Sequence, residues 1–296
     1  MNKLFKTAFT LIELLVVIAI IGILSGLIVI SMSGVTNKAN VAKAQVFSNS
    51  LRNSLMLNLV SEWNFNNLTG TVGSEISTAS NFVVDGWGSN AGTAYGSPVL
   101  KSDSDCITTK CLYFNGSTDY ILFQGNNFNF GTEDFTIALW VKPEASTSYH
   151  HFFAMPTQAT LALKAYGQNK NIYFYTPTFS TNSTITALYK ENVWNYIVFT
   201  RRSSVAYIYL DGVLMGSTPS FTNNIANDTV NIGNGYTGEY LKGFLDDVRI
   251  YNAAVPAFQI KEQYYAGLNK LLNNGGITRE EYLSRVLDLN NSYGKR

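Results

Sequence analysis

The sequence has little charge, two histidines and two cysteines, and each shortage excludes a class of function. Its 21 lysines and arginines nearly balance 20 aspartates and glutamates among 296 residues, so the composition gives no reason to expect a nucleic-acid partner. The histidines, His150 and His151, are adjacent in a segment that we expect to be a surface loop, which does not support a Ser-His-Asp hydrolase. No internal repeat of the kind that builds propellers or solenoids is visible.

The two cysteines, Cys106 and Cys111, lie close together in the sequence. For an exported domain we expect them to form one disulfide around a small loop. Closing so short a loop contributes roughly 2 kcal/mol in the chain-entropy model, which orders a turn without holding the whole fold together. A metal site needs more ligands than this pair supplies, and the sequence has no CxxC motif.

One long apolar run is present, from Phe9 to Met32, and its only charged residue is Glu13. A helix of about 20 apolar residues crosses the hydrocarbon core of a bilayer, so this run predicts a transmembrane helix. Lys3 and Lys6 precede the run and predict a cytoplasmic amino end, with the bulk of the chain outside. A carboxylate in lipid costs about 2.5–3.5 kcal/mol, so Glu13 is a candidate functional residue with a partner.

The segment MNKLFKTA followed by FTLIELLVVIAIIGIL resembles the amino terminus of type IV pilins and type II secretion pseudopilins. The resemblance implies that a prepilin peptidase removes residues 1–8 by cutting between Ala8 and Phe9, and that Phe9 is then N-methylated. It also implies that Glu13 pairs with the terminal amine of a neighbouring subunit. The family prefers Gly before the cut, where this chain has Ala8. The alternative is a plain single-pass anchor in which Glu13 lies near the lipid headgroups.

Apolar residues continue at spacings of three and four after this run, which predicts one long helix over residues 9–60. Such a helix would be roughly 78 Å long. We expect residues 9–32 to form its transmembrane or filament-core half, and its second half to dock on a globular head.

Residues 61–267 change to period-two alternation with β-branched and aromatic residues, which predicts a mainly β fold. Short strands such as FTIALWVKP alternate with Gly, Asn, Ser and Pro clusters, and Asp211-Gly212 predicts a tight hairpin. Eight segments, among them LVSEWNFNN, CLYFNGSTDYI and GFLDDVRIYNAAV, occur in the order seen in laminin-G-like domains of the concanavalin A-like superfamily. The resemblance implies a jelly-roll β-sandwich of two antiparallel sheets, a fold that by itself does not define a function.

Residues 268–296 turn helical again and predict a short C-terminal helix that packs on the sandwich or on the long helix. Thr278, with Glu281 three residues later, has the spacing of a capping box.

No catalytic site is predicted. The concanavalin A-like superfamily includes glucanases whose carboxylates come from an ExDxxE strand, and this sequence lacks that pattern. The acidic pairs Glu133-Asp134 and Asp246-Asp247 are adjacent, so their side chains would face opposite sides of a strand. We therefore predict that the chain is not an enzyme.

A structural calcium ion is common in the same superfamily, and the resemblance makes Asp246 the first candidate ligand, with Asp85 and Asp119 behind it. Calcium takes about six to eight oxygen ligands, and Asn115 stands where the family usually has an Asp. The alternative is that Asp246 caps a turn or pairs with Arg249.

Aromatic residues on loops are the side chains on which a sugar would stack. Trp87, Tyr236 and Tyr240 lie in Gly- and Asn-rich segments and are the ligand-binding candidates, with ordinary packing as the alternative. Trp140 and Trp194 lie in strand-like segments and are predicted to be core residues.

Together these features predict a pilin-like subunit that assembles through its N-terminal helix into a filament and displays an adhesive head for a glycan or protein. Its expected partners are other pilins, the prepilin peptidase and the assembly machinery, and its expected location is first the bacterial cytoplasmic membrane and then the cell surface. The alternatives are a minor pseudopilin of a type II secretion system and a lectin-like binding module on a single-pass anchor.

Overall fold

The computed structural model describes residues 11–22, 56–76, 82–124, 128–156, 161–176, 187–218, 220–235 and 238–293. The chain divides into two compact units, Met1–Ser54 and Leu55–Arg296, and we call the second unit the head. In the first unit, residues 11–22 form an α-helix with exposed apolar side chains. No helix within the described ranges is both long and apolar enough to cross a membrane. Residues 9–10 and 23–55 of the predicted long helix, together with the Ala8–Phe9 junction, lie outside the described residues.

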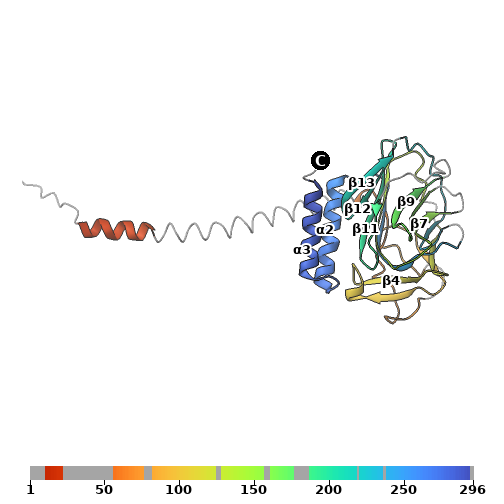
Figure 1. The fold of residues 1–296 in the computed structure, drawn as a ribbon, viewed down its shortest axis with the longest axis horizontal. Helices are drawn as coiled ribbons and strands as arrows, with labels where there is room; N and C mark the ends of the chain where they lie inside the picture. Colours follow the sequence, from red (N-terminus) through yellow and green to blue (C-terminus); the bar gives the residue numbers. More distant parts are fainter. Residues whose placement is uncertain are drawn as a thin grey trace, which may run out of the picture. The chain divides into compact units, whose positions relative to one another are not determined.

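The head contains an antiparallel eight-stranded sheet in the order β13-β12-β11-β6-β15-β4-β3, with β1 also paired to β15. Figure 1 labels β13, β12, β11 and β4 of this sheet. Its strands are β1 (Leu59–Trp63), β3 (Val99–Ser102), β4 (Lys110–Asn115), β6 (Phe135–Pro143), β11 (Asn195–Arg202), β12 (Val205–Leu210), β13 (Val213–Thr218) and β15 (Lys242–Tyr251). One edge of β15 serves two partners, since β4 pairs with Lys242–Leu245 and β1 pairs with Val248–Tyr251. A bulge between Asp246 and Arg249 separates the two ladders.

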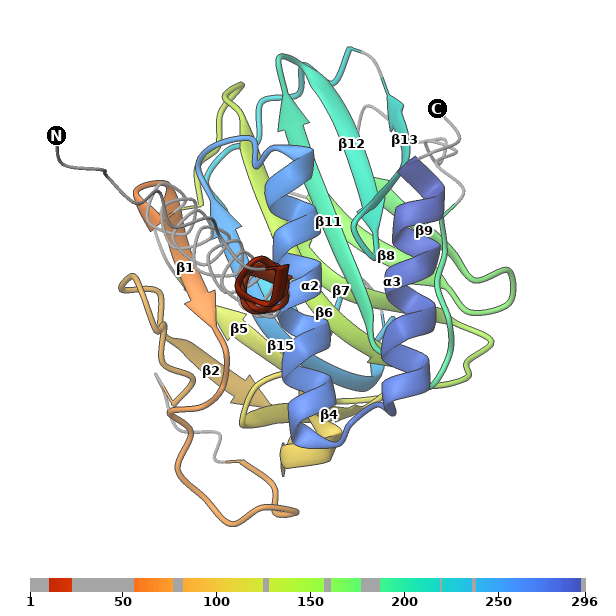
Figure 2. The same cartoon turned by 90° about the vertical axis from the view of Figure 1, so that its left-hand side faces the viewer.

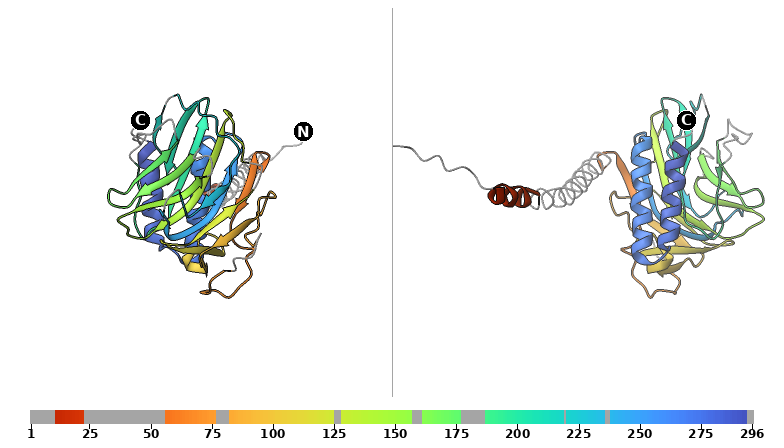
Figure 3. Two further views of the ribbon diagram at one scale, coloured as in Figure 1. Left: turned by 90° about the vertical axis from the view of Figure 1, so that its right-hand side faces the viewer. Right: turned by 60° about the vertical axis from the view of Figure 1, so that its left-hand side comes forward.

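A second antiparallel sheet has seven strands in the order β10-β9-β8-β7-β14-β5-β2. They are β2 (Gly92–Tyr95), β5 (Tyr120–Phe123), β7 (Tyr149–Met155), β8 (Leu161–Tyr166), β9 (Asn171–Tyr175), β10 (Ala187–Leu188) and β14 (Val230–Ile232). The two sheets form the predicted β-sandwich, seen from the side opposite its helices in the left panel of Figure 3. The predicted sandwich of two antiparallel sheets is therefore confirmed.

The main core lies between the sheets and follows the two-residue period of the strands. In β8, Leu161, Leu163 and Ala165 belong to this core, whereas Lys164 and Tyr166 face the other side. The predicted hairpin at Asp211-Gly212 is also present: Leu210 pairs with Val213, and both turn residues have positive φ, as a type I′ turn requires.

Two helices, α2 (Ala257–Asn274) and α3 (Arg279–Tyr293), cover the outer face of the eight-stranded sheet (Figure 2). The indole of Trp140 in β6 stacks on Tyr264 of α2, with ring centroids 5.6 Å apart, and on Tyr196 of β11, at 5.0 Å. Trp140 and Trp194 are both buried, as predicted. The predicted cap of α3 is present, because the Glu281 amide donates to Thr278 Oγ1 at 3.1 Å.

The predicted element boundaries are wrong at both ends of the sandwich. Helix α2 begins at Ala257, inside the range 61–267 assigned to strands, and β1 begins at Leu59, inside the range assigned to the long helix. The N-cap of α2 is Pro256, whose side chain makes no capping hydrogen bond, so the usual sequence signal for a helix start is absent. A short 3₁₀ helix, η1 (Asp103–Asp105), precedes β4.

Gly267 in α2 permits the close contact with Trp140, because a Cβ atom there would overlap the indole ring. This overlap is severe, so we expect overpacking to cost about 3 kcal/mol. Helix propensity returns roughly 1 kcal/mol, so Gly267→Ala should lower the free energy of unfolding by about 2 kcal/mol. Urea unfolding of the full-length protein, followed by tryptophan fluorescence, measures this difference.

Asn269→Ala, an exposed change in the same helix, is the control and should stay within about 0.5 kcal/mol of wild type. A Gly267→Ala protein more stable than wild type would contradict the described contact.

Candidate functional site

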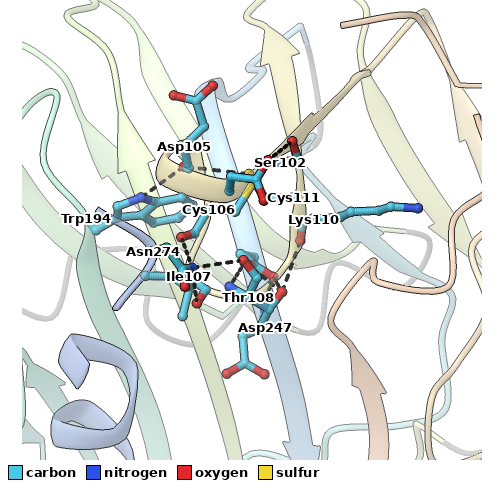
Figure 4. Close-up of a disulfide and its surroundings, with 12 residues drawn as sticks. Ser102, Asp105, Cys106, Ile107, Thr108, Lys110, Cys111, Trp194, Asp247 and Asn274 are labelled. Carbon is cyan, nitrogen blue, oxygen red and sulfur yellow. Dashed lines mark hydrogen bonds between the residues drawn. A yellow bond between two sulfur atoms is a disulfide. The ribbon is translucent and has the colours of Figure 1, made fainter. Parts of the chain in front are cut away.

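Cys106 and Cys111 form the predicted disulfide, which closes the loop before β4 (Figure 4). Asn274, at the end of α2, donates its side-chain amide to the carbonyls of Cys106, Ile107 and Thr108 at 3.3–3.4 Å. This loop therefore ties α2 to the eight-stranded sheet.

Asp246, the first calcium candidate, lies fully buried at the bulge of β15. Its carboxylate accepts from the Thr108 amide at 2.7 Å, from the Thr108 hydroxyl at 3.0 Å and from the Asp247 amide at 2.7 Å. Burial, followed by the charge of Asp247, raises the pKa of Asp246 well above its usual range. The ion pair with Arg249 belongs to Asp247 instead, at 2.8 Å. The Asp246 carboxylate thus accepts hydrogen bonds from backbone amides at the bulge, where the strand paired with this edge of β15 changes from β4 to β1.

Asp85 organises the loop before β2. Its two carboxylate oxygens accept from the backbone amides of Glu62, Trp87, Gly88 and Asn90 at 2.9–3.1 Å. Gly88 approaches the Val60 carbonyl so closely that a Cβ atom would clash. The loop is therefore held against β1 by one buried carboxylate.

Asp119 orders the turns beside β5 through its buried carboxylate, as Asp85 orders the loop before β2. Its carboxylate accepts from the Asn115 amide at 2.9 Å, the Ser97 amide at 2.8 Å and the Asn115 side chain at 2.8 Å. The structure does not bring Asp85, Asp119 and Asp246 into one site: within the described part of the chain, no group of three or more His, Cys, Asp or Glu side chains could hold a metal ion. Calcium binding stays a prediction.

His150 and His151 do not lie in a surface loop, so that prediction is wrong: both are fully buried in β7. The two aromatic residues that follow, Phe152 and Phe153, continue the strand and both belong to the main core, with a register shift between His151 and Phe153. The Lys242 amide donates to His150 Nδ1 at 3.2 Å. Burial lowers the pKa of His150 to about 4 and also lowers the pKa of His151.

His151 anchors the loop between β14 and β15. Its Nε2 lies 2.5 Å from a carboxylate oxygen of Glu239, and Lys164 Nζ lies 3.4 Å from the same oxygen. The hydrogen bond to His151 is the main cause that lowers the pKa of Glu239. Gly235 packs on the His151 ring with no room for a side chain. The Lys164 ammonium also lies 4.1 Å from the ring centroid of Tyr149.

The loop aromatics predicted as ligand-binding residues have different settings. Trp87 is 45% exposed on the loop that Asp85 organises. Tyr240 is half-buried and lies beside Tyr120, with ring centroids 6.5 Å apart. Tyr236 lies outside the described residues.

Tyr240 belongs to a tyrosine cluster, defined here as Tyr95, Tyr120 and Tyr240. Tyr95 of β2 and Tyr120 of β5 are direct cross-strand partners, and their rings stack with centroids 4.8 Å apart and planes 6° apart. Tyr95 is 38% exposed. Tyr95 and Tyr120 were not predicted as site residues, because their contact depends on strand register and not on a local motif.

The comparisons with known proteins agree with both resemblances noted in the sequence. A family model of the concanavalin A-like lectin/glucanases superfamily matches residues 115–261, and a model of the prokaryotic N-terminal methylation motif matches residues 6–29. No curated protein sequence matches the chain.

Several solved structures share the fold. Domain 4 of AbnA, a GH43 extracellular arabinanase from Geobacillus stearothermophilus in complex with arabinotriose, is 19% identical, with 69% of this chain and 97% of that chain covered and a TM-score of 0.56. The ligand-binding domain of botulinum neurotoxin serotype D in complex with N-acetylneuraminic acid is 15% identical, with coverages of 74% and 53% and a TM-score of 0.55.

The binding domain of botulinum neurotoxin DC in complex with rat synaptotagmin II is 13% identical, with coverages of 72% and 52% and a TM-score of 0.54. The match thus spans about half the length of these neurotoxin domains. At such identities the likeness shows the fold alone, a lectin-like β-sandwich.

Removing the Asp85 carboxylate should leave buried amides without acceptors. We expect Asp85→Ala to lower the free energy of unfolding by about 2–4 kcal/mol, measured by urea unfolding of the full-length protein. Asp134→Ala is the matched control, because Asp134 accepts from a single exposed amide, that of Ser203, and its loss should cost about 0.5 kcal/mol or less. Equal costs for the two variants would contradict the role assigned to Asp85.

Stability should fall as the pH is lowered toward 4, because His150 is buried in its neutral form. Its folded pKa is about 4 and lies below the ordinary value of 6.5, so its contribution is complete above pH 6.5 and is lost on acidification. The expected slope from this residue is about 1.4 kcal/mol per pH unit. His150→Gln should show a slope smaller by about that amount when the free energy of unfolding is measured from pH 7 to 4.5. Identical slopes for the two proteins would exclude this linkage.

Proposed function

We propose that this chain is a pilin-like subunit whose lectin-like head binds a glycan or protein outside the cell. The observation that carries the proposal is the joining, in one chain, of the methylation motif at residues 6–29 to a β-sandwich head. A prepilin peptidase would remove residues 1–8 and expose Phe9 for N-methylation. The precursor would be a single-pass protein of the bacterial cytoplasmic membrane, and the mature subunit would reside in a surface filament.

Filament assembly requires an interaction that sets the register between neighbouring N-terminal helices. A buried carboxylate is costly in an apolar environment, and an opposite charge within hydrogen-bond distance offsets that cost. The terminal amine created at Phe9 of a neighbouring subunit is the natural partner for Glu13. The apolar side chains of residues 11–22, exposed in the single chain, would be covered by other subunits.

The binding role of the head rests on its fold and on its exposed aromatic residues. Its structural neighbours were solved with arabinotriose, with N-acetylneuraminic acid and with rat synaptotagmin II, which supports a glycan or protein ligand without selecting one. The paired carboxylates of a glycosidase were not found in the sequence, and we propose that the head binds its ligand without catalysis. The balanced charge gives no support for binding nucleic acid.

A minor pseudopilin of a type II secretion system is the second candidate, because the same methylation motif supports it. The copy number in sheared filaments separates the two: a filament subunit is present in many copies, whereas a minor pseudopilin is present in few.

We expect Glu13→Leu to insert in the membrane at a normal level and to enter filaments about tenfold less than wild type, since the lost charge pair is worth over 1 kcal/mol. Quantitative immunoblots of membrane and sheared-filament fractions measure the two steps separately. Leu15→Ile, an apolar change in the same helix, is the control and should assemble normally. Normal filament incorporation of Glu13→Leu would rule out the assembly role of this carboxylate.

A further inference from the structure

The proposed function does not say which residues of the head bind the ligand, and the tyrosine cluster of Tyr95, Tyr120 and Tyr240 is a candidate site. We propose that this cluster binds a neutral oligosaccharide, which stacks on the rings and exchanges hydrogen bonds with the phenol hydroxyls. The inference rests on the proposed binding function of the head and names its ligand class and its site.

The cluster lies at the β2 edge of the seven-stranded sheet, where Tyr95 is 38% exposed and Tyr120 and Tyr240 are half-buried. Tyr95 and Tyr120 stack with planes 6° apart, so one face of each ring covers the other, and Tyr240 completes the group at a tilt of 51° to Tyr120. An aromatic ring presents both an apolar face and, in tyrosine, a polar tip, a combination that suits the apolar face and the hydroxyl rim of a sugar. The next pair toward the other end of these strands, Thr93 and Leu122, is partly exposed and extends the surface.

Among the described residues, the charged groups beside the cluster already have partners. The neighbouring carboxylate, Asp119, already accepts hydrogen bonds from two backbone amides and from the Asn115 side chain. Burial and the neighbouring tyrosines raise the pKa of Tyr120, so its hydroxyl stays neutral and able to donate. An acidic sugar would require a cation, and the two lysines closest to Tyr240 among the described residues already have carboxylate partners: Lys164 lies 3.4 Å from Glu239 and Lys242 lies 3.5 Å from Glu144. A neutral ligand therefore fits the cluster best.

The third ring is held in place by the loop that carries it. Tyr240 follows Glu239, whose carboxylate is fixed between His151 and Lys164. The Asn234–Tyr240 bridge and the absence of space at Gly235 further restrain the described residues at the two ends of this loop. A ring that is already ordered loses little conformational freedom when a ligand binds, which favours affinity.

The size of the surface also favours a glycan over a folded protein. A stable protein interface buries about 800 Å² on each partner. Three tyrosines, of which Tyr95 is exposed to only 38%, offer much less than this, but enough for a short oligosaccharide.

The test uses the full-length protein in detergent micelles on an array of neutral and acidic oligosaccharides, among them arabinotriose, cellotetraose and 3′-sialyllactose. Neutral glycans should bind, and titration calorimetry of the best binder should show an affinity loss of about tenfold or more for Tyr95→Ala and Tyr120→Ala. Tyr95→Phe keeps the ring and should stay within about threefold of wild type. Thermal unfolding of each variant shows that the head remains folded.

Tyr166→Ala is the matched control, because Tyr166 stacks on Tyr149 at 4.5 Å in the same sheet but outside the cluster. Its affinity should equal that of wild type. Unchanged binding by folded Tyr95→Ala and Tyr120→Ala proteins overturns the inference, as does an array on which only acidic glycans bind or no glycan binds. If no glycan binds but filaments adhere to cells through a protein, the proposed function stands and only this inference fails. Failed processing or assembly would refute the proposed function whatever the array shows.

Discussion

The stacking of Trp140 against helix α2 is the contact on which the arrangement of the head depends. It lets α2 and α3 cover one side of the eight-stranded sheet, while the main core covers the other, so the central strands β6 and β11 are buried on both faces. The described part of the sheet around β6 and β11 therefore presents no exposed face. The described aromatic cluster with an exposed ring consequently belongs to the other sheet, where Tyr95 and Tyr120 meet at the β2 edge.

Single buried carboxylates order the connections between strands. Asp85 and Asp119 each collect backbone amides from loop segments far apart in the sequence, and Asp246 does so at the bulge of β15. These hydrogen bonds give the loops defined conformations in a head whose composition is rich in polar, uncharged residues. The sequence resemblance predicted the same three residues as calcium ligands. The structure places them at separate loop junctions, where each carboxylate accepts hydrogen bonds from backbone amides.

Much of the fold could be predicted because its signals are local. Period-two segments such as FTIALWVKP became strands, Asp211-Gly212 became a hairpin turn, and Cys106 and Cys111 became a disulfide. The misses were of two kinds. His150 and His151 were placed in a loop because polar residues suggested exposure, although burial beneath Glu239 and beside Lys242 decides their setting. The cluster of Tyr95, Tyr120 and Tyr240 depends on strand register and loop anchoring, which no short motif encodes.

The central claim is that one chain joins a processed, assembling N-terminal helix to a binding head. The most direct measurement is mass spectrometry of the amino terminus of the protein purified from its native cells. The account predicts a terminal peptide that begins at Phe9 and carries one added methyl group on its amine. A protein that retains residues 1–8 would contradict the claim and leave the head on a plain membrane anchor.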